Sequence, residues 1–261
     1  MIRGDFHTHT THCDGKNTPR EMAEAALARG MTHLGFSAHS PMAFSETYTL
    51  EDVARYYDEV RALQAEYRDR ITIYCGIEKD LYSPMDTSAY DYVIGSVHYV
   101  IKNGEYLVLD YSKNRLREGV ERLFGGDWYT LAEAYFAAVA ELGQMQPAII
   151  GHLDLITKYN EGGCLFDETH PRYLAAAKAA IEALIPYGIP FEINTGAIFR
   201  GYRTAPYPAP HLLRHIAACG GSAVLSGDVH AADGLELRFD ECRALAAACG
   251  CPLVDLPKGL E

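Results

Sequence analysis

The chain has 261 residues, a length that α/β barrels commonly use for one domain. Lys and Arg total 23 against 35 Asp and Glu, so the formal net charge is −12 with neutral histidine. This acidity argues against sequence-independent binding to nucleic acid, which needs basic side chains against the phosphates. Hydrophobic residues make up 48% and charged residues 22%, which excludes a disordered chain. No apolar run approaches the roughly 18 residues that a membrane span needs.

The first residues lack the basic start and apolar stretch of a signal peptide. The seven cysteines are odd in number and scattered, and none of them forms a C-x-x-C motif. This pattern does not suit a disulfide framework. We therefore expect reduced thiols and a cytoplasmic location.

Short β-rich runs alternate with helical stretches along the whole chain. The expected strands span residues 2–7, 33–37, 72–77, 92–98, 148–152, 190–194 and 223–227. Such alternation predicts a mainly parallel sheet, and seven strands favour a closed or nearly closed barrel. An open doubly wound sheet is the alternative. Its common nucleotide-binding versions lack support, because no G-x-G-x-x-G follows the first strand and no P-loop occurs.

The helices between these strands have readable ends. Thr18 and Glu21 predict a capping box for a helix that ends at Gly30. Thr130 and Glu133 predict another capping box, for a helix that ends near Gly143. Further helices are expected at 49–67, at 171–184, and from 210 to the Gly220-Gly221 pair.

One stretch departs from the alternation of strands and helices. Asn103-Gly104 lies between two β-prone runs in residues 99–109, which predicts a hairpin after the fourth strand. We expect one domain over residues 1–261, with a hairpin and helix insertion at about 99–128. Residues 112–128 either cover a site or form an ordinary surface excursion.

Histidines and carboxylates follow the expected strands, at the end where parallel barrels build their active sites. Nine of them are candidate metal ligands: His7, His9, Asp14, His39, Glu78, His98, His152, Asp228 and His230. Imidazole and carboxylate bind Zn²⁺, Mn²⁺ and Fe²⁺. Because one ion normally takes three or four protein ligands, nine candidates predict two or three ions. Glu78, alone on a central strand, is the expected bridge.

The other histidines are expected to have structural roles, except His12. His211 and His215 lie four residues apart on a helix, but Leu212 stands where the zinc motif H-E-x-x-H has glutamate. His33 begins a strand and His170 precedes a helix. His12 stays open as an additional ligand beside Asp14.

The spaced motifs resemble the PHP (polymerase and histidinol phosphatase) superfamily from residue 2 to about residue 230. The matching residues are His7-Thr-His9, Asp14-Gly15, His39, Glu78, His98, His152 and Asp228-Val-His230. Residues 76–78, 95–98, 151–159 and 192–201 are similar to the histidinol-phosphate phosphatase branch. Two positions depart from the family pattern. Ala38 stands where an acidic residue is usual, and Lys158 where many members carry arginine.

The resemblance implies a distorted (β/α)₇ barrel with three metal ions. It assigns His7, His9, Glu78 and Asp228 to one ion, Glu78, His98 and His152 to a second, and Asp14, His39 and His230 to a third. It implies hydrolysis of L-histidinol phosphate in histidine biosynthesis, by attack of a hydroxide that bridges two ions. The expected catalytic residues are Glu78, Asp228 and His230.

Two cations are expected to bind the phosphate of the substrate. Lys158 and Arg200 each follow a strand end that bears ligands, and Arg203 is a weaker candidate. The proton for the leaving alkoxide has three candidate sources, which are Asp154, His230 and a metal-bound water. The expected partner is a small phosphate ester, with no membrane or nucleic acid. A homo-oligomer stays open.

Four other functions remain as alternatives. The first is a PHP phosphoesterase acting on another small phosphate ester or a nucleotide. A 3′–5′ nuclease is disfavoured by the acidic charge and the lack of a basic, aromatic strip. An amidohydrolase is disfavoured because no lysine is expected at a strand end. A non-enzymatic metal-binding module is disfavoured because structural sites need far fewer ligands.

Overall fold

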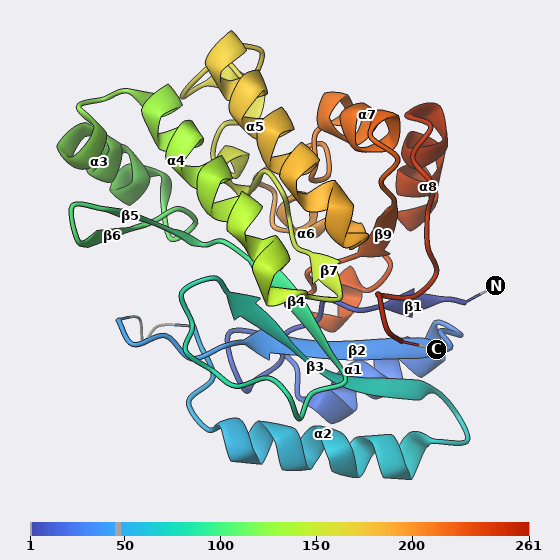
Figure 1. Cartoon of the computed structure of the whole chain (residues 1–261). Coiled ribbons are helices and arrows are strands. Elements are labelled where there is room, and N and C mark those ends of the chain that lie inside the picture. The colour runs from blue at the N-terminus through green and yellow to red at the C-terminus, as the bar shows by residue number, and fades with distance from the viewer. Residues whose placement is uncertain (1, 45–47, 261) are drawn as a thin grey trace.

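The computed structural model describes residues 2–44 and 48–260. Seven parallel strands form one sheet in the order β1-β2-β3-β4-β7-β8-β9 (Figure 1). Their bounds are β1 Gly4–Asp5, β2 His33–His39, β3 Thr72–Asp80, β4 Tyr92–Ser96, β7 Ile149–Ile150, β8 Phe191–Asn194 and β9 Ala223–Ser226. Backbone hydrogen bonds join His7 and His9 to Val229, next to the first and last strands. The sheet is therefore a nearly closed barrel, which confirms the expected distorted (β/α)₇ fold.

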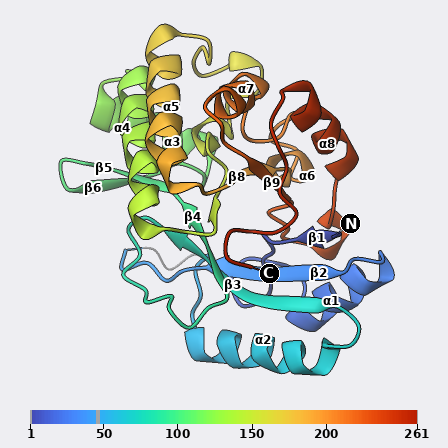
Figure 2. The same ribbon diagram turned by 45° about the vertical axis from the view of Figure 1, so that its right-hand side comes forward.

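Helices cover the outside of the barrel. They are α1 Pro19–Ala28, α2 Val53–Tyr67, α3 Lys113–Phe124, α4 Trp128–Glu141, α5 Pro171–Leu184, α6 Gly196–Phe199, α7 Pro210–Ala218 and α8 Phe239–Ala248. Figures 1 and 2 show α1 and α2 against β2 and β3, with α4 and α5 side by side over the opposite part of the barrel. Helices α6 and α8 are not predicted from the sequence. No helix within the described ranges is long and apolar enough to cross a lipid bilayer.

Several helix ends follow the local signals. The capping box of α1 is confirmed, because Glu21 N donates to Thr18 Oγ1 and Thr18 N donates to Glu21 Oε2. The bounds of α5 agree with the prediction. Helix α2 begins at Val53, four residues later than predicted. The side chain of Asp52 caps it by accepting from Arg55 N.

The predicted capping box of α4 is wrong. The helix begins at Trp128, two residues before Thr130, and Asp127 caps it by accepting from Tyr129 N and Thr130 N. Thr130 and Glu133 instead interact with Arg172 of α5. Thr130 therefore lies inside the helix, where its hydroxyl also donates to Asp127 Oδ2 at 2.7 Å.

The end of α4 and two strands also differ from expectation. The helix ends at Glu141, and Gly143 lies inside a short 3₁₀ turn, Leu142–Met145. The strands β1 and β7 have only two residues each. At β7 the reason is visible, because His152 N donates to the side chain of Glu192 and not to a neighbouring strand. The chain thus leaves the sheet where it enters the site.

The predicted hairpin is confirmed. Strands β5 (Tyr99–Lys102) and β6 (Glu105–Val108) pair antiparallel. Asn103 and Gly104 join them with φ of 53° and 80°, which suits the primed turns of two-residue hairpins. The hairpin projects beyond the barrel beside α3 (Figure 1).

Candidate metal centre and phosphate cavity

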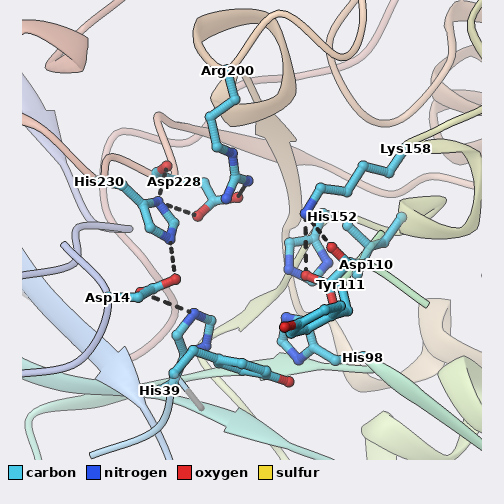
Figure 3. Close-up of a pocket in the computed structure, with 12 residues that line it drawn as sticks. Asp14, His39, His98, Asp110, Tyr111, His152, Lys158, Arg200, Asp228 and His230 are labelled. Atoms are coloured by element: carbon cyan, nitrogen blue, oxygen red, sulfur yellow. Dashed lines mark hydrogen bonds and ion pairs between the residues drawn. The ribbon is translucent and has the colours of Figure 1, made fainter. Parts of the chain in front are cut away.

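The nine predicted ligands meet at the carboxyl end of the barrel strands. A cavity of about 270 Å³ opens there (Figure 3). It is lined by Asp14, His39, Tyr48, His98, Asp110, Tyr111, His152, Leu155, Lys158, Arg200, Asp228 and His230. Seven strands and the loops after them thus bring together residues that lie up to 223 positions apart in the chain.

Glu78 lies at the centre of the cluster, with its carboxylate fully buried. Its Oε1 is 2.9 Å from His152 Nε2 and 3.3 Å from His98 Nε2. Its Oε2 is 2.8 Å from His39 Nδ1 and 3.2 Å from His7 Nε2. His9 Nε2 follows at 3.6 Å. One carboxylate therefore faces five imidazoles, the arrangement that a bridging ligand requires.

Three overlapping groups of donors have ligand atoms within 4.8 Å of one another. They are His7, His9 and Glu78; His39, Glu78 and His98; and His9, Asp14, His39 and His230. Several of the buried atoms that face the centre lack a hydrogen-bond partner, among them His7 Nε2, His9 Nε2 and Glu78 Oε2. Buried polar atoms are seldom left unpaired. The donor set and its unpaired atoms fit divalent metal ions.

The grouping differs in detail from the one that the family resemblance implies. Asp228 Oδ1 lies 3.3 Å from His9 Nε2 and 3.8 Å from His7 Nε2, so it can join the first group. His39 takes the place expected of His152 in the second group, although His152 also contacts Glu78.

Two buried carboxylates, which the sequence did not mark as such, orient histidines of the cluster. Glu192 accepts from His7 Nδ1 at 2.5 Å and from His152 N at 2.7 Å. Asp80 accepts from His98 N at 2.8 Å and lies 3.2 Å from His98 Nδ1. Such contacts leave the Nε2 atoms free to bind metal. Asp80 follows Glu78 by two residues on one strand, a spacing that places both on the same face and was a usable signal.

The charges of the cluster are strongly coupled. Burial, with His230 and His39 nearby, lowers the pKa of His9 to about 3, so its imidazole is neutral. Burial opposes ionisation of Glu78, but His7 and His39 outweigh it and hold the pKa of Glu78 well below its usual value. The carboxylate is thus ionised and ready to bind a cation.

Both predicted phosphate-binding cations line the cavity. Arg200 Nη2 lies 2.9 Å from Asp228 Oδ2, and Lys158 Nζ lies 3.3 Å from Asp110 Oδ2. Figure 3 shows them reaching in from two different sides. Asp110 and Tyr111 come directly after the hairpin, so the insertion forms part of the wall. No local motif marks these two residues, because only the path of the insertion brings them to the cavity.

Other candidates lie away from the cavity. Asp154 is not among its lining residues; its carboxylate accepts from Ala209 N, and burial raises its pKa to about 7. Arg203 pairs with Glu168 at 2.9 Å. His12 Nε2 lies 2.9 Å from Glu59 Oε2.

One lysine does lie near a strand end, contrary to the prediction. Strand β3 extends further than expected and includes Lys79. Lys79 lies on the opposite face of the strand from Glu78, and its Nζ donates to Met85 O at 2.7 Å. It therefore does not contact the metal cluster.

The comparisons with known proteins agree with this geometry. The model of the PHP domain matches residues 5–196. This chain belongs to the PHP family. A Deinococcus radiodurans protein named "Probable histidinol-phosphatase" is 33% identical to it over 255 residues, which cover 90% of this chain and 89% of that protein. The PHP chain is thus an enzyme of the histidinol-phosphatase branch, a class of phosphoric monoester hydrolases.

Two solved structures share the fold. One is a Listeria monocytogenes protein assigned as a histidinol phosphatase, with a TM-score of 0.78 and 18% identity over 92% of this chain and 99% of that one. The other is a Lactococcus lactis histidinol phosphate phosphatase, with a TM-score of 0.68 and 22% identity over 97% of this chain and 95% of that one. The Lactococcus structure contains zinc, L-histidinol and phosphate.

Proposed function

We propose that this chain hydrolyses L-histidinol phosphate to L-histidinol and phosphate, as a cytoplasmic step of histidine biosynthesis. The observation that carries the proposal is a buried Glu78 surrounded by five histidines, beside a cavity that also holds Lys158 and Arg200. The name of the D. radiodurans relative and the ligands of the Lactococcus structure support this choice of substrate.

The proposed ligand sets are those that the family resemblance implies. His7, His9, Glu78 and Asp228 would hold one ion, Glu78, His98 and His152 a second, and Asp14, His39 and His230 a third. Bound divalent ions supply an activated water and neutralise phosphate charge. Glu192 and Asp80 keep the imidazoles in the orientation that binding requires.

The two cations would bind the phosphoryl oxygens. The planar guanidinium of Arg200 can make two parallel hydrogen bonds, whereas Lys158 acts as a point charge. Asp154 lies off the cavity, and His230 Nε2 faces Asp14 Oδ2 at 3.1 Å as part of a ligand set. We therefore assign the proton of the leaving alkoxide to water in the cavity.

The cavity also suits the amine of the substrate, which lies one carbon away from the phosphate-bearing carbon. Asp110 Oδ1 has no hydrogen-bond partner, while Oδ2 pairs with Lys158. Lys158 lowers the pKa of Asp110, against the effect of burial, so the carboxylate is ionised. An ionised carboxylate with a free oxygen can bind an ammonium group. This favours histidinol phosphate over phosphate esters that lack an amine.

Phosphate release tests the proposal. L-histidinol phosphate is compared with other phosphomonoesters, nucleotides and single-stranded DNA, before and after chelation and re-addition of Mn²⁺ or Zn²⁺. We expect metal-dependent activity with kcat/KM higher for histidinol phosphate by several orders of magnitude. Equal metal-dependent rates across the panel would contradict the assignment of histidinol phosphate as the substrate. Full activity after complete removal of metal would contradict the mechanism, as would a trapped phospho-residue.

A further inference from the structure

A second cluster of donors lies on the outside of the barrel, where α5 packs against α7. It consists of Glu182 on α5, His215 on α7 and Cys219 directly after α7. We propose that these three residues form a further metal site, which takes one zinc-like ion and is separate from the catalytic cluster. The proposal does not depend on the proposed function.

The distances fit a tetrahedral ion. Two donors on zinc, with bonds of roughly 2.0–2.3 Å, lie about 3.3–3.6 Å apart. Cys219 Sγ is 3.6 Å from His215 Nε2, and Glu182 Oε1 is 3.0 Å from the same nitrogen. All three donor atoms lie within 4.8 Å of one another. A shift of a few tenths of an ångström by Glu182, whose side chain is 59% exposed, would complete the geometry.

One ring nitrogen lies between the two other donors of this cluster. A proton on His215 Nε2 can be donated to Glu182, and Cys219 then has no acceptor on that nitrogen. A cation between the three atoms would interact with all of them at once, because imidazole, thiolate and carboxylate all donate electron pairs to a metal.

The surroundings favour a cation. One thiolate and one carboxylate balance the charge of a divalent ion. The site lies at the carboxyl end of α7, where the partial negative charge of the helix is located. Three protein donors leave a fourth position for water. His211, one turn earlier on α7, is not in the donor group, so this site is not the i, i+4 histidine pair of the zinc motif.

Cobalt substitution distinguishes this site from the catalytic one, because a thiolate bound to Co²⁺ gives a charge-transfer band in the near ultraviolet. We expect the band in the full chain after titration with Co²⁺, and its loss in Cys219→Ser. Two matched controls should retain it: Cys13→Ser, whose thiol lies 3.5 Å from His9 Nδ1, and Cys164→Ser, an exposed thiol elsewhere. Absence of the band, or its survival in Cys219→Ser, would overturn the proposal.

Alkylation of Cys219 provides a second, local readout by peptide mass spectrometry. Zn²⁺ should protect Cys219 in the unmodified chain. Protection should need more than tenfold higher Zn²⁺ in Glu182→Gln or His215→Ala, since even the loss of an outer contact typically costs about 10–100-fold in metal affinity. Phosphate release by these variants should be unchanged, because neither residue lines the catalytic cavity. Alkylation of Cys219 at the same rate with and without Zn²⁺ would refute the site.

Discussion

At the scale of single residues, Glu78 shows how one buried charge can organise a site. Both of its oxygens face imidazoles, and its side chain is shielded from solvent. A charge in such a place is costly unless it is paired. Its position near the end of β3, beside His39 of β2 and close to His98 just after β4, supplies two of the partners.

Glu78→Gln preserves the shape of this side chain and removes its charge. We expect metal content to fall and kcat/KM to drop by more than the 10–100-fold typical of an outer contact. Elemental analysis after dialysis, together with phosphate release, checks this. Glu59→Gln, beside His12, is the matched control and should retain its metal. A Glu78→Gln enzyme with full metal content would rule out the bridging role.

Arg200→Ala tests the phosphate-binding role of this residue. We expect KM for the phosphomonoester to rise by about 10–100-fold, because a charge-assisted contact of roughly 1.5–3 kcal/mol is lost. Steady-state kinetics with saturating metal separates KM from kcat. Arg203→Ala, three residues further along and outside the cavity, should keep KM within about twofold. Equal effects of both substitutions would remove Arg200 from the phosphate site.

At the scale of elements, local motifs compete with contacts between elements. The α4 start shows this, since Thr130 and Glu133 have the spacing of a capping box but turn toward Arg172. Asp127, four residues before Leu131, caps the helix instead. Asp127 also accepts from Arg172 of α5, so the contact between the helices reinforces this earlier start, against a local capping preference of about 1 kcal/mol.

Asp127→Ala should therefore lower the free energy of unfolding by about 1 kcal/mol through loss of the helix cap. Thr130→Ala should cost less, because the backbone N–H groups at the start of α4 keep their acceptor. Urea unfolding of the two variants gives the comparison. A larger loss of unfolding free energy for Thr130→Ala would instead support Thr130 as the cap.

The contact between β3 and β4 requires a glycine at position 76, where no side chain is present to meet the Tyr92 ring. A Cβ at Gly76 would lie 2.2 Å from Cε1 of Tyr92, whose hydroxyl donates to Phe6 O and Phe36 O. We expect Gly76→Ala to destabilise the chain by about 1–3 kcal/mol through overpacking. In Tyr92→Leu the same alanine should cost less, which a double-mutant cycle in urea measures. Additive losses would show that the Tyr92 ring is not the obstacle.

At the scale of the whole molecule, the metal cluster joins loops from all sides of the barrel. His7 follows the first strand of the sheet, Glu78 lies on the third and His230 follows the last, and the parallel order places these strand ends at one rim. Ligands that bind the folded chain raise its stability in proportion to the logarithm of their concentration. The cluster should therefore be a substantial source of stability as well as activity.

Removal of the metal should lower Tm by about 5–10 °C relative to protein at a metal concentration near 100 times Kd. Re-addition of Mn²⁺ or Zn²⁺ should restore it, as differential scanning calorimetry can show. The experiment is repeated in Cys219→Ser, which lacks the outer site and should give a similar shift. An unchanged Tm, with loss of metal verified by elemental analysis, would contradict this prediction.

The sequence alone predicted the order of the strands along the chain, the barrel, the hairpin and nine candidate ligands at the strand ends. These follow from local signals, because breaker residues and β-prone runs mark strands and parallel packing gathers their carboxyl ends. The tertiary structure decided which atoms meet. Asp110 reaches the cavity only through the path of the insertion, and Cys219 meets Glu182 only where α7 packs against α5. Contacts between distant segments depend on how elements pack in space, and no local pattern encodes that distance.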